Sequence, residues 1–153
     1  MSHTISFTIQ GDSEGYITFE CPFCGSEFKL QAGEYQNEDI PIKELFCPYC
    51  GLTSEKDNFL SEEVRQKIYD LMENYAIEQL NKAFKSMERA VNRNGKGIIK
   101  MKSKPLKKVN VKEIREKDTA ETVFCCQHCG QHNKVLYCAG ASKIFCPYCG
   151  VDI

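Results

Sequence analysis

Four copies of one short pattern decide the fold of this chain: CPFCG at residues 21–25, CPYCG at 47–51, CQHCG at 126–130 and CPYCG at 146–150. The copies contain eight of the ten cysteines. A C-x-x-C turn presents two thiolates from one tight loop, so two such turns provide the four ligands of a tetrahedral metal site. Because four protein ligands leave no coordination position for a substrate, the pattern predicts structural metal sites.

An internal repeat indicates which turns share a metal ion. Residues 19–29 align without a gap to residues 124–134, and residues 45–51 align to residues 144–150. The 22 residues between the first two turns and the 16 between the last two suit a small antiparallel hairpin. The predicted ligands are Cys21, Cys24, Cys47 and Cys50 in the first site and Cys126, Cys129, Cys146 and Cys149 in the second.

These turns resemble the knuckles of the zinc-ribbon class, a rubredoxin-like fold found in transcription factors, polymerase subunits and many ribosome-associated proteins. The resemblance covers about half of the chain and implies a double zinc ribbon with two zinc ions. The order of strand pair, ribbon, long helix and C-terminal cysteine cluster is also similar to that of a group of bacterial proteins, which leaves the function open. Four sulfurs suit iron as well as zinc, so a rubredoxin-like electron carrier is an alternative, which the red colour of an iron protein would reveal.

The segments between the knuckles predict further elements. Ile5, Phe7 and Ile9 alternate with polar residues and precede a turn-forming stretch and the extended residues 16–19. This pattern predicts an N-terminal hairpin that leads into the first knuckle.

A long helix is predicted after the first ribbon. From Ser61 to Arg93 there is no glycine or proline, and apolar residues recur at helical spacing. Ser61 predicts the start of the helix, and Asn94-Gly95 predicts its end. Two interpretations stay open: an intramolecular brace that packs its apolar face on both ribbons and the basic segment described below, or a helix-mediated homodimer.

A basic segment follows the helix. Between Arg93 and Lys117 there are ten lysine or arginine residues and two glutamates, and basic and apolar residues alternate around Pro105. This predicts a pair of β-strands with the lysines largely on one exposed face. Such a face is typical of a protein that binds nucleic-acid phosphates, although a solvated face or a flexible linker that neutralises the acidic first ribbon is an alternative. The residues assigned to nucleic-acid binding are Lys96, Lys100, Lys102, Lys104, Lys107, Lys108 and Lys112.

The predicted fold class is α+β, with two small zinc-ribbon β modules joined by one long α-helix and a basic segment similar to a β-hairpin. The expected domains are an N-terminal hairpin with the first ribbon at residues 1–57, the helix at 58–94, the basic segment at 95–118 and the second ribbon at 119–153. Neither ribbon is long enough to fold on an apolar core alone, so metal removal is expected to unfold both.

The remaining cysteines and the histidines are predicted to lie outside the metal sites. Cys125 aligns with Glu20, outside the knuckle, and Cys138 lies in the hairpin between two knuckles, so both are interpreted as free thiols. His128 aligns with Phe23 of the first knuckle and is expected to be an exposed side chain. Either His128 or His132 could replace a cysteine ligand, but two complete four-cysteine sets make this alternative weak.

These observations favour a non-enzymatic binding or adaptor protein with nucleic acid as the preferred partner. A protein-interaction scaffold is the alternative, with the helix and the acidic first ribbon as docking surfaces. The CPYC pattern also occurs in glutaredoxins, but only four residues follow Cys149, so the helix that this chemistry requires cannot follow. No signal peptide and no run of eighteen apolar residues is recognisable, so we expect a soluble cytoplasmic protein without membrane contact.

Overall fold

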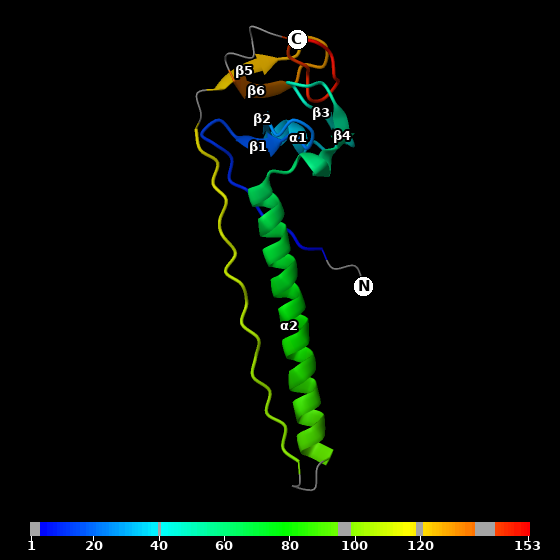
Figure 1. Ribbon diagram of the computed structural model, residues 1–153, viewed down its shortest axis with the longest axis vertical. Helices are drawn as coiled ribbons and strands as arrows, with labels where there is room; N and C mark the ends of the chain where they lie inside the picture. The colour runs from blue at the N-terminus through cyan, green and yellow to red at the C-terminus, as the bar shows by residue number, and fades with distance from the viewer. Residues whose placement is uncertain (1–3, 40, 95–98, 119–120, 137–142) are drawn as a thin grey trace. The chain divides into compact units, whose positions relative to one another are not determined.

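The computed structural model describes residues 4–39, 41–94, 99–118, 121–136 and 143–153 (Figure 1). The fold is α+β, with two cysteine-rich ribbon modules and one long helix. It divides into two compact units, which are described one by one. The helix unit comprises Met1–Ser6 and Gln66–Lys112, and the ribbon unit comprises Phe7–Arg65 and Glu113–Ile153.

One antiparallel sheet unites the two ribbons of the ribbon unit. Its strands follow the order β1-β2-β6-β5, so that each ribbon contributes a hairpin and the two inner strands pair with each other. In that central pair Lys29 lies opposite Lys134. These lysines occupy the same position in the internal repeat, so a pseudo-twofold axis passes between them. The strands are β1 (Tyr16–Glu20), β2 (Glu27–Gln31), β5 (Glu121–Cys125) and β6 (His132–Leu136).

Each ribbon completes its metal site with a second, shorter hairpin. In the first ribbon this hairpin consists of β3 (Glu44–Phe46) and β4 (Thr53–Glu55). The corresponding pairing in the second ribbon is the single bridge between Phe145 and Asp152. The short helix α1 (Ala32–Tyr35) follows β2, and the 3-10 helix η1 (Lys56–Phe59) follows β4.

The hydrophobic core combines both ribbons. Phe28 and Leu30 of β2 are fully buried and belong to the same cluster as Val135 of β6. Phe59 of η1 is also fully buried, and its ring meets that of Phe28 edge to face with centroids 5.9 Å apart. Because strands from both repeats enclose these side chains, the ribbons share one apolar core.

The predicted N-terminal hairpin is wrong. Ile5, Phe7 and Ile9 form no strand, and β1 pairs instead with β2, which the first knuckle brings back alongside it. The Asp12 carboxylate accepts hydrogen bonds from the backbone N–H groups of Glu14 and Tyr16. The stretch before β1 therefore forms a side-chain-capped turn, and the sheet is extended through β2 toward the second ribbon.

The predicted long helix is confirmed as α2 (Glu62–Asn94). It begins directly after Ser61, whose carbonyl accepts a hydrogen bond from the N–H of Arg65, and it carries Glu62 and Glu63 in its first turn. Acidic side chains stabilise this end because their negative charge is attracted to the positive end of the helix dipole. Gly95, the expected stop signal, lies outside the described residues.

The basic segment runs alongside α2 (Figure 1). Three asparagines of the helix bind its backbone. Asn81 donates to the carbonyl of Leu106 at 3.0 Å and accepts from its N–H at 2.8 Å. Asn74 binds both backbone groups of Val109, and Asn92 binds both groups of Met101. We call Asn74, Asn81 and Asn92 the asparagine ladder.

The predicted pair of β-strands in the basic segment is wrong. Its described residues 99–114 contain no strand. The backbone groups of Met101, Leu106 and Val109 bind asparagine side chains, which replace a strand partner. Pro105, at the centre, has no N–H to donate to a sheet.

Candidate metal centres and basic surface

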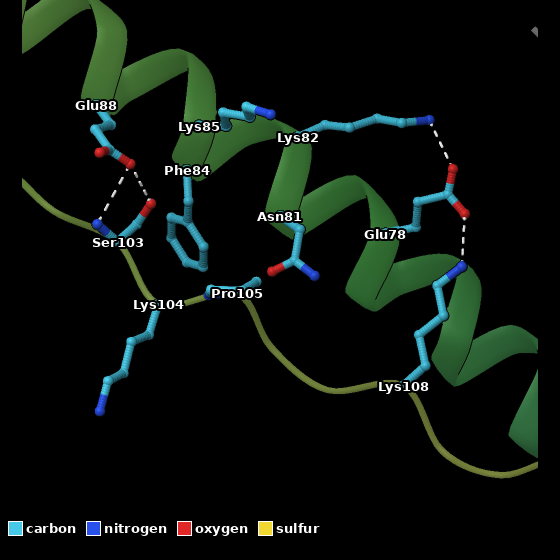
Figure 2. Close-up of a pocket in the computed structure, with 10 residues that line it drawn as sticks. All are labelled: Glu78, Asn81, Lys82, Phe84, Lys85, Glu88, Ser103, Lys104, Pro105 and Lys108. Atoms are coloured by element: carbon cyan, nitrogen blue, oxygen red, sulfur yellow. Dashed lines mark hydrogen bonds and ion pairs between the residues drawn. The ribbon is translucent and has the colours of Figure 1, made fainter.

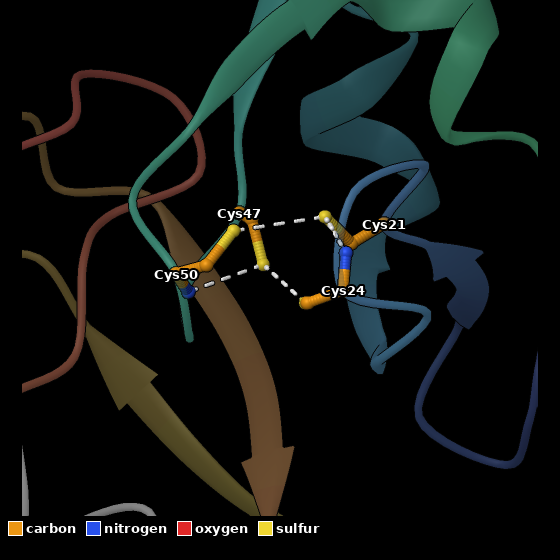
Figure 3. Close-up of side chains that lie close together, drawn as sticks. All are labelled: Cys21, Cys24, Cys47 and Cys50. Carbon is orange, nitrogen blue, oxygen red and sulfur yellow. Dashed lines mark hydrogen bonds between the residues drawn. The ribbon is translucent and has the colours of Figure 1, made fainter.

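The first cysteine cluster lies where two hairpin turns meet (Figure 3). Cys21 and Cys24 come from the turn between β1 and β2, and Cys47 and Cys50 come from the turn between β3 and β4. The Sγ atoms of Cys21 and Cys50 are 3.8 Å apart, and those of Cys24 and Cys47 are 3.7 Å apart. Each short distance therefore joins one turn to the other.

The second cluster repeats this arrangement. Cys126 and Cys129 come from the turn between β5 and β6, and Cys146 and Cys149 come from the C-terminal turn. The Sγ atoms of Cys126 and Cys149 are 3.7 Å apart, and those of Cys129 and Cys146 are 3.5 Å apart. The structure thus brings the eight predicted ligands together in the two predicted sets of four.

The spacing of the sulfurs fits a tetrahedral metal ion. Sulfurs about 2.3 Å from a central zinc lie about 3.8 Å from one another. The short sulfur–sulfur distances of 3.5–3.8 Å agree with this value, and all the ligand atoms of each cluster lie within 4.8 Å of one another. Each cluster can therefore bind one ion with four sulfurs, which leaves no position for a substrate.

Backbone amides and burial set the chemistry of the thiols. The N–H groups of Phe23 and Cys24 point at the Cys21 sulfur, at 3.4 and 3.5 Å, and favour its thiolate form. Burial raises the pKa of the Cys47 and Cys146 thiols above the ordinary value of 9.0. A metal ion must displace protons from such thiols, so metal affinity decreases as the pH falls.

The two centres are related by reciprocal backbone contacts. The N–H of Phe46 donates to the carbonyl of Pro147 at 2.8 Å, and the N–H of Phe145 donates to the carbonyl of Pro48 at 2.9 Å. These are equivalent residues of the two repeats, so the second hairpins meet about the same pseudo-twofold axis as the sheet.

Two glycines permit this approach. Gly51 and Gly150 end their knuckles at φ values of 73° and 71°. A Cβ on Gly51 would lie 3.0 Å from the Phe145 ring, and a Cβ on Gly150 would lie 2.8 Å from the Phe46 ring. The glycines therefore permit both the left-handed backbone of the knuckle and the close contact between the ribbons.

The cysteine outside the clusters and the histidines behave as predicted. Cys125 is an exposed free thiol, whereas Cys138 lies outside the described residues. His128 is exposed on the second knuckle. The Nδ1 of His132 lies 2.7 Å from a carboxylate oxygen of Glu34, and neither histidine belongs to a metal-binding group in the described part of the chain.

The predicted nucleic-acid-binding lysines lie in the helix unit. The described members are Lys100, Lys102, Lys104, Lys107, Lys108 and Lys112, and all six are exposed, whereas Lys96 lies outside the described residues. The helix adds Lys82, Lys85, Arg89 and Arg93, which are also exposed. Residues 79–94 and 99–112 together contain these ten cations and one carboxylate, that of Glu88, a net charge of +9.

Two features of these sites were not found from the sequence. The asparagine ladder would have been recognisable only as Asn74 and Asn81 recurring after seven residues of helix. Asp12 is one of the acidic residues of the first ribbon, but its carboxylate is buried between Lys29 and Lys134, with Oδ2 3.3 and 3.1 Å from their Nζ atoms. No pattern of spacing connects Asp12 to lysines 17 and 122 residues away.

Comparison with protein-family models, with curated proteins and with solved structures finds no significant match to this chain. The cysteine clusters and their geometry therefore carry the assignment of a module that resembles a double zinc ribbon.

Proposed function

We propose that this chain is a non-enzymatic, zinc-stabilised adaptor that binds nucleic acid through its helix unit. Two zinc ions hold the ribbon unit together, and the exposed cations of α2 and the basic segment bind phosphates. The closed four-sulfur clusters support a structural role for the metal, because catalytic zinc keeps a coordination position for water or substrate.

Zinc is the proposed ion in both clusters. The sulfur spacing matches zinc, and a four-thiolate set in a small ribbon is the usual structural zinc site. Iron in the same sites would make the protein a rubredoxin-like electron carrier. Elemental analysis and the colour of the purified chain separate the two, because the zinc protein is colourless and the iron protein is red.

The observation that carries the proposed partner is the charge of the helix unit. Ten exposed cations and a single carboxylate occupy residues 79–94 and 99–112. Glu78, just outside this range, pairs with Lys82 at 2.9 Å and with Lys108 at 3.1 Å, so two of the ten have a carboxylate partner. Most of the excess positive charge remains for phosphates, whose binding releases counterions.

Salt-dependent binding tests this function. Binding to RNA or DNA oligonucleotides should weaken steeply with salt, and the triple change Lys100→Gln, Lys102→Gln and Lys107→Gln should lower the salt slope by about two to three. The matched control changes Lys43, Lys56 and Lys143, which belong to the ribbon unit and lie outside the basic segment, to glutamine, which alters the net charge equally. Absence of salt-sensitive binding to any nucleic acid at low ionic strength would rule out the proposed function.

A protein partner is the second candidate, because α2 carries an exposed apolar stripe. Tyr69, Met72, Leu80 and Met87 are 65, 55, 46 and 53% exposed, and their spacing places them on one face of the helix. None of them takes part in the asparagine ladder. A protein that covers this stripe would make the chain an interaction scaffold.

In the described part of the chain, no helix is both long and apolar enough to span a membrane.

A further inference from the structure

A cavity of about 430 Å³ opens between α2 and the basic segment (Figure 2). The ring of Phe84 extends from the helix toward the segment and, together with Pro105, supplies apolar surface. Four lysines surround this surface: Lys82 and Lys85 from the helix, and Lys104 and Lys108 from the segment. An aromatic ring among cations therefore lies within the basic surface, although the basic segment itself contains no aromatic residue.

The lysines of this cavity divide into two pairs. Lys82 and Lys108 both bind the Glu78 carboxylate, which fixes them at one end. Neither Lys85 nor Lys104 forms an ion pair within the described residues. The second carboxylate of the cavity, Glu88, accepts hydrogen bonds from the hydroxyl and the N–H of Ser103. Two cations of the cavity are thus available to an anionic ligand.

We propose that this cavity binds one unpaired nucleobase of single-stranded nucleic acid, stacked on Phe84, while Lys85 and Lys104 contact the adjacent phosphates. This inference rests on the proposed function and specifies that the basic surface binds single-stranded nucleic acid. Proteins that bind single strands combine a basic groove with aromatic rings on which bases stack. The cavity volume lies in the range of small-ligand sites, and a duplex would keep the faces of its bases hidden.

The absence of tryptophan from the chain makes stacking directly measurable. Phe84→Trp introduces a single fluorescent indole at the site, and Leu80→Trp introduces one on the apolar stripe as a matched control. Titration with oligothymidylate or oligoadenylate should quench the fluorescence of the Phe84→Trp protein and leave that of the Leu80→Trp protein unchanged. Duplex DNA of the same length should quench neither.

A second variant measures the contribution of the ring without a reporter. Phe84→Leu keeps an apolar side chain but removes the stacking face, so single-strand affinity should fall about 5- to 150-fold, while duplex affinity stays unchanged. Zinc content and the sedimentation of the variant should match the wild type, which shows that the fold is retained.

The possible failures separate the two proposals. Salt-sensitive binding without quenching at position 84, or with unchanged single-strand affinity for Phe84→Leu, would overturn the stacking site and leave the proposed function intact. Equal quenching at positions 80 and 84 would also overturn it. Loss of all salt-sensitive binding in the wild type would overturn both.

Discussion

Asp12 forms ion pairs with the two buried lysines at the centre of the ribbon unit. Its carboxylate is fully buried between the side chains of Lys29 and Lys134, which are 3 and 5% exposed. These lysines lie opposite each other at the pseudo-twofold axis, where two ammonium groups would otherwise repel. The Asp12 carboxylate from the preceding turn therefore binds a lysine of each repeat at their junction, and Glu14 supplies Lys134 with a second carboxylate. The backbone hydrogen bonds of Asp12 fix the turn at the same time.

Removing this charge should destabilise the ribbon unit strongly. Asp12→Asn leaves the buried ammonium group of Lys29 without a carboxylate and that of Lys134 with Glu14 alone, so the free energy of unfolding should fall by about 3–5 kcal/mol in a denaturant titration. Asp118→Asn is the control, because Asp118 also caps this turn through Ser13 but is exposed. Equal losses for the two variants would show that the buried pairing contributes nothing.

The ion pairs of Asp12 with its two lysines predict a dependence of stability on pH. Burial opposes ionisation of Asp12, but hydrogen bonds from Tyr16 and Lys134 outweigh it and hold its pKa below the ordinary 3.8. The stabilisation is therefore present above pH 3.8 and is lost as the pH falls through the folded-state pKa. Burial likewise opposes the charge of Lys134, but Glu14 and Asp12 raise its pKa above 10.5. The stability that charged Lys134 contributes is therefore lost only as the pH rises beyond that value. Asp12→Asn should flatten the acid limb of a stability profile.

At the scale of elements, the asparagine ladder depends on a match between two periodicities. Asn74 and Asn81 are about 10.5 Å apart along the helix. Their partners Val109 and Leu106 are three residues apart, about 10 Å in an extended chain. An extended segment can therefore follow a helix for several turns without a strand partner, which explains why alternating residues here do not form a sheet.

Loss of one asparagine should release the segment locally. Each of these hydrogen bonds contributes about 0.5–1.5 kcal/mol, so Asn81→Ala should speed amide exchange at Leu106 by about tenfold or more. Gln79→Ala, on an exposed residue outside the ladder, should leave exchange at Leu106 unchanged. Unaltered protection in the Asn81 variant would mean that the ladder does not hold the segment.

If α2 forms a homodimer, its apolar stripe should pair with that of a second copy. Residues 66–78 carry a net charge of −2 and residues 79–94 a net charge of +3, so antiparallel helices would match opposite charges. Leu80→Glu should convert a self-associating protein into a folded monomer in sedimentation experiments, whereas Arg89→Gln, the same charge change off the stripe, should not. A wild type that is monomeric at all concentrations would contradict pairing.

At the largest scale that the structure describes, the two metal centres belong to one folding unit. They share the sheet, the core and the reciprocal hydrogen bonds from Phe46 to Pro147 and from Phe145 to Pro48. The sequence predicts the two ribbons as separate domains, at residues 1–57 and 119–153. A common core instead implies that the loss of one metal ion weakens the other site.

Zinc stoichiometry and retention test this coupling. The wild type should bind about two zinc ions, one per four-cysteine cluster. Cys146→Ser should lower this to about one, and the remaining ion should be removed by a chelator faster than from the wild type. Cys125→Ser should change neither value, because this thiol lies outside both clusters. Unchanged retention of the remaining ion would show that the ribbons are independent.

The sequence alone determined the ligand sets, the repeat and the long helix, because these follow from local rules: C-x-x-C spacing, knuckle glycines and a run without helix breakers. Only the tertiary structure decided what joins these parts. Pairing of β2 with β6, burial of Asp12 between two lysines and the position of Phe84 beside Pro105 all involve residues whose separation in the chain carries no signal. Local rules fail for the basic segment. Its alternation of basic and apolar residues predicts strands, but its backbone groups bind the side chains of asparagines that are distant in the sequence.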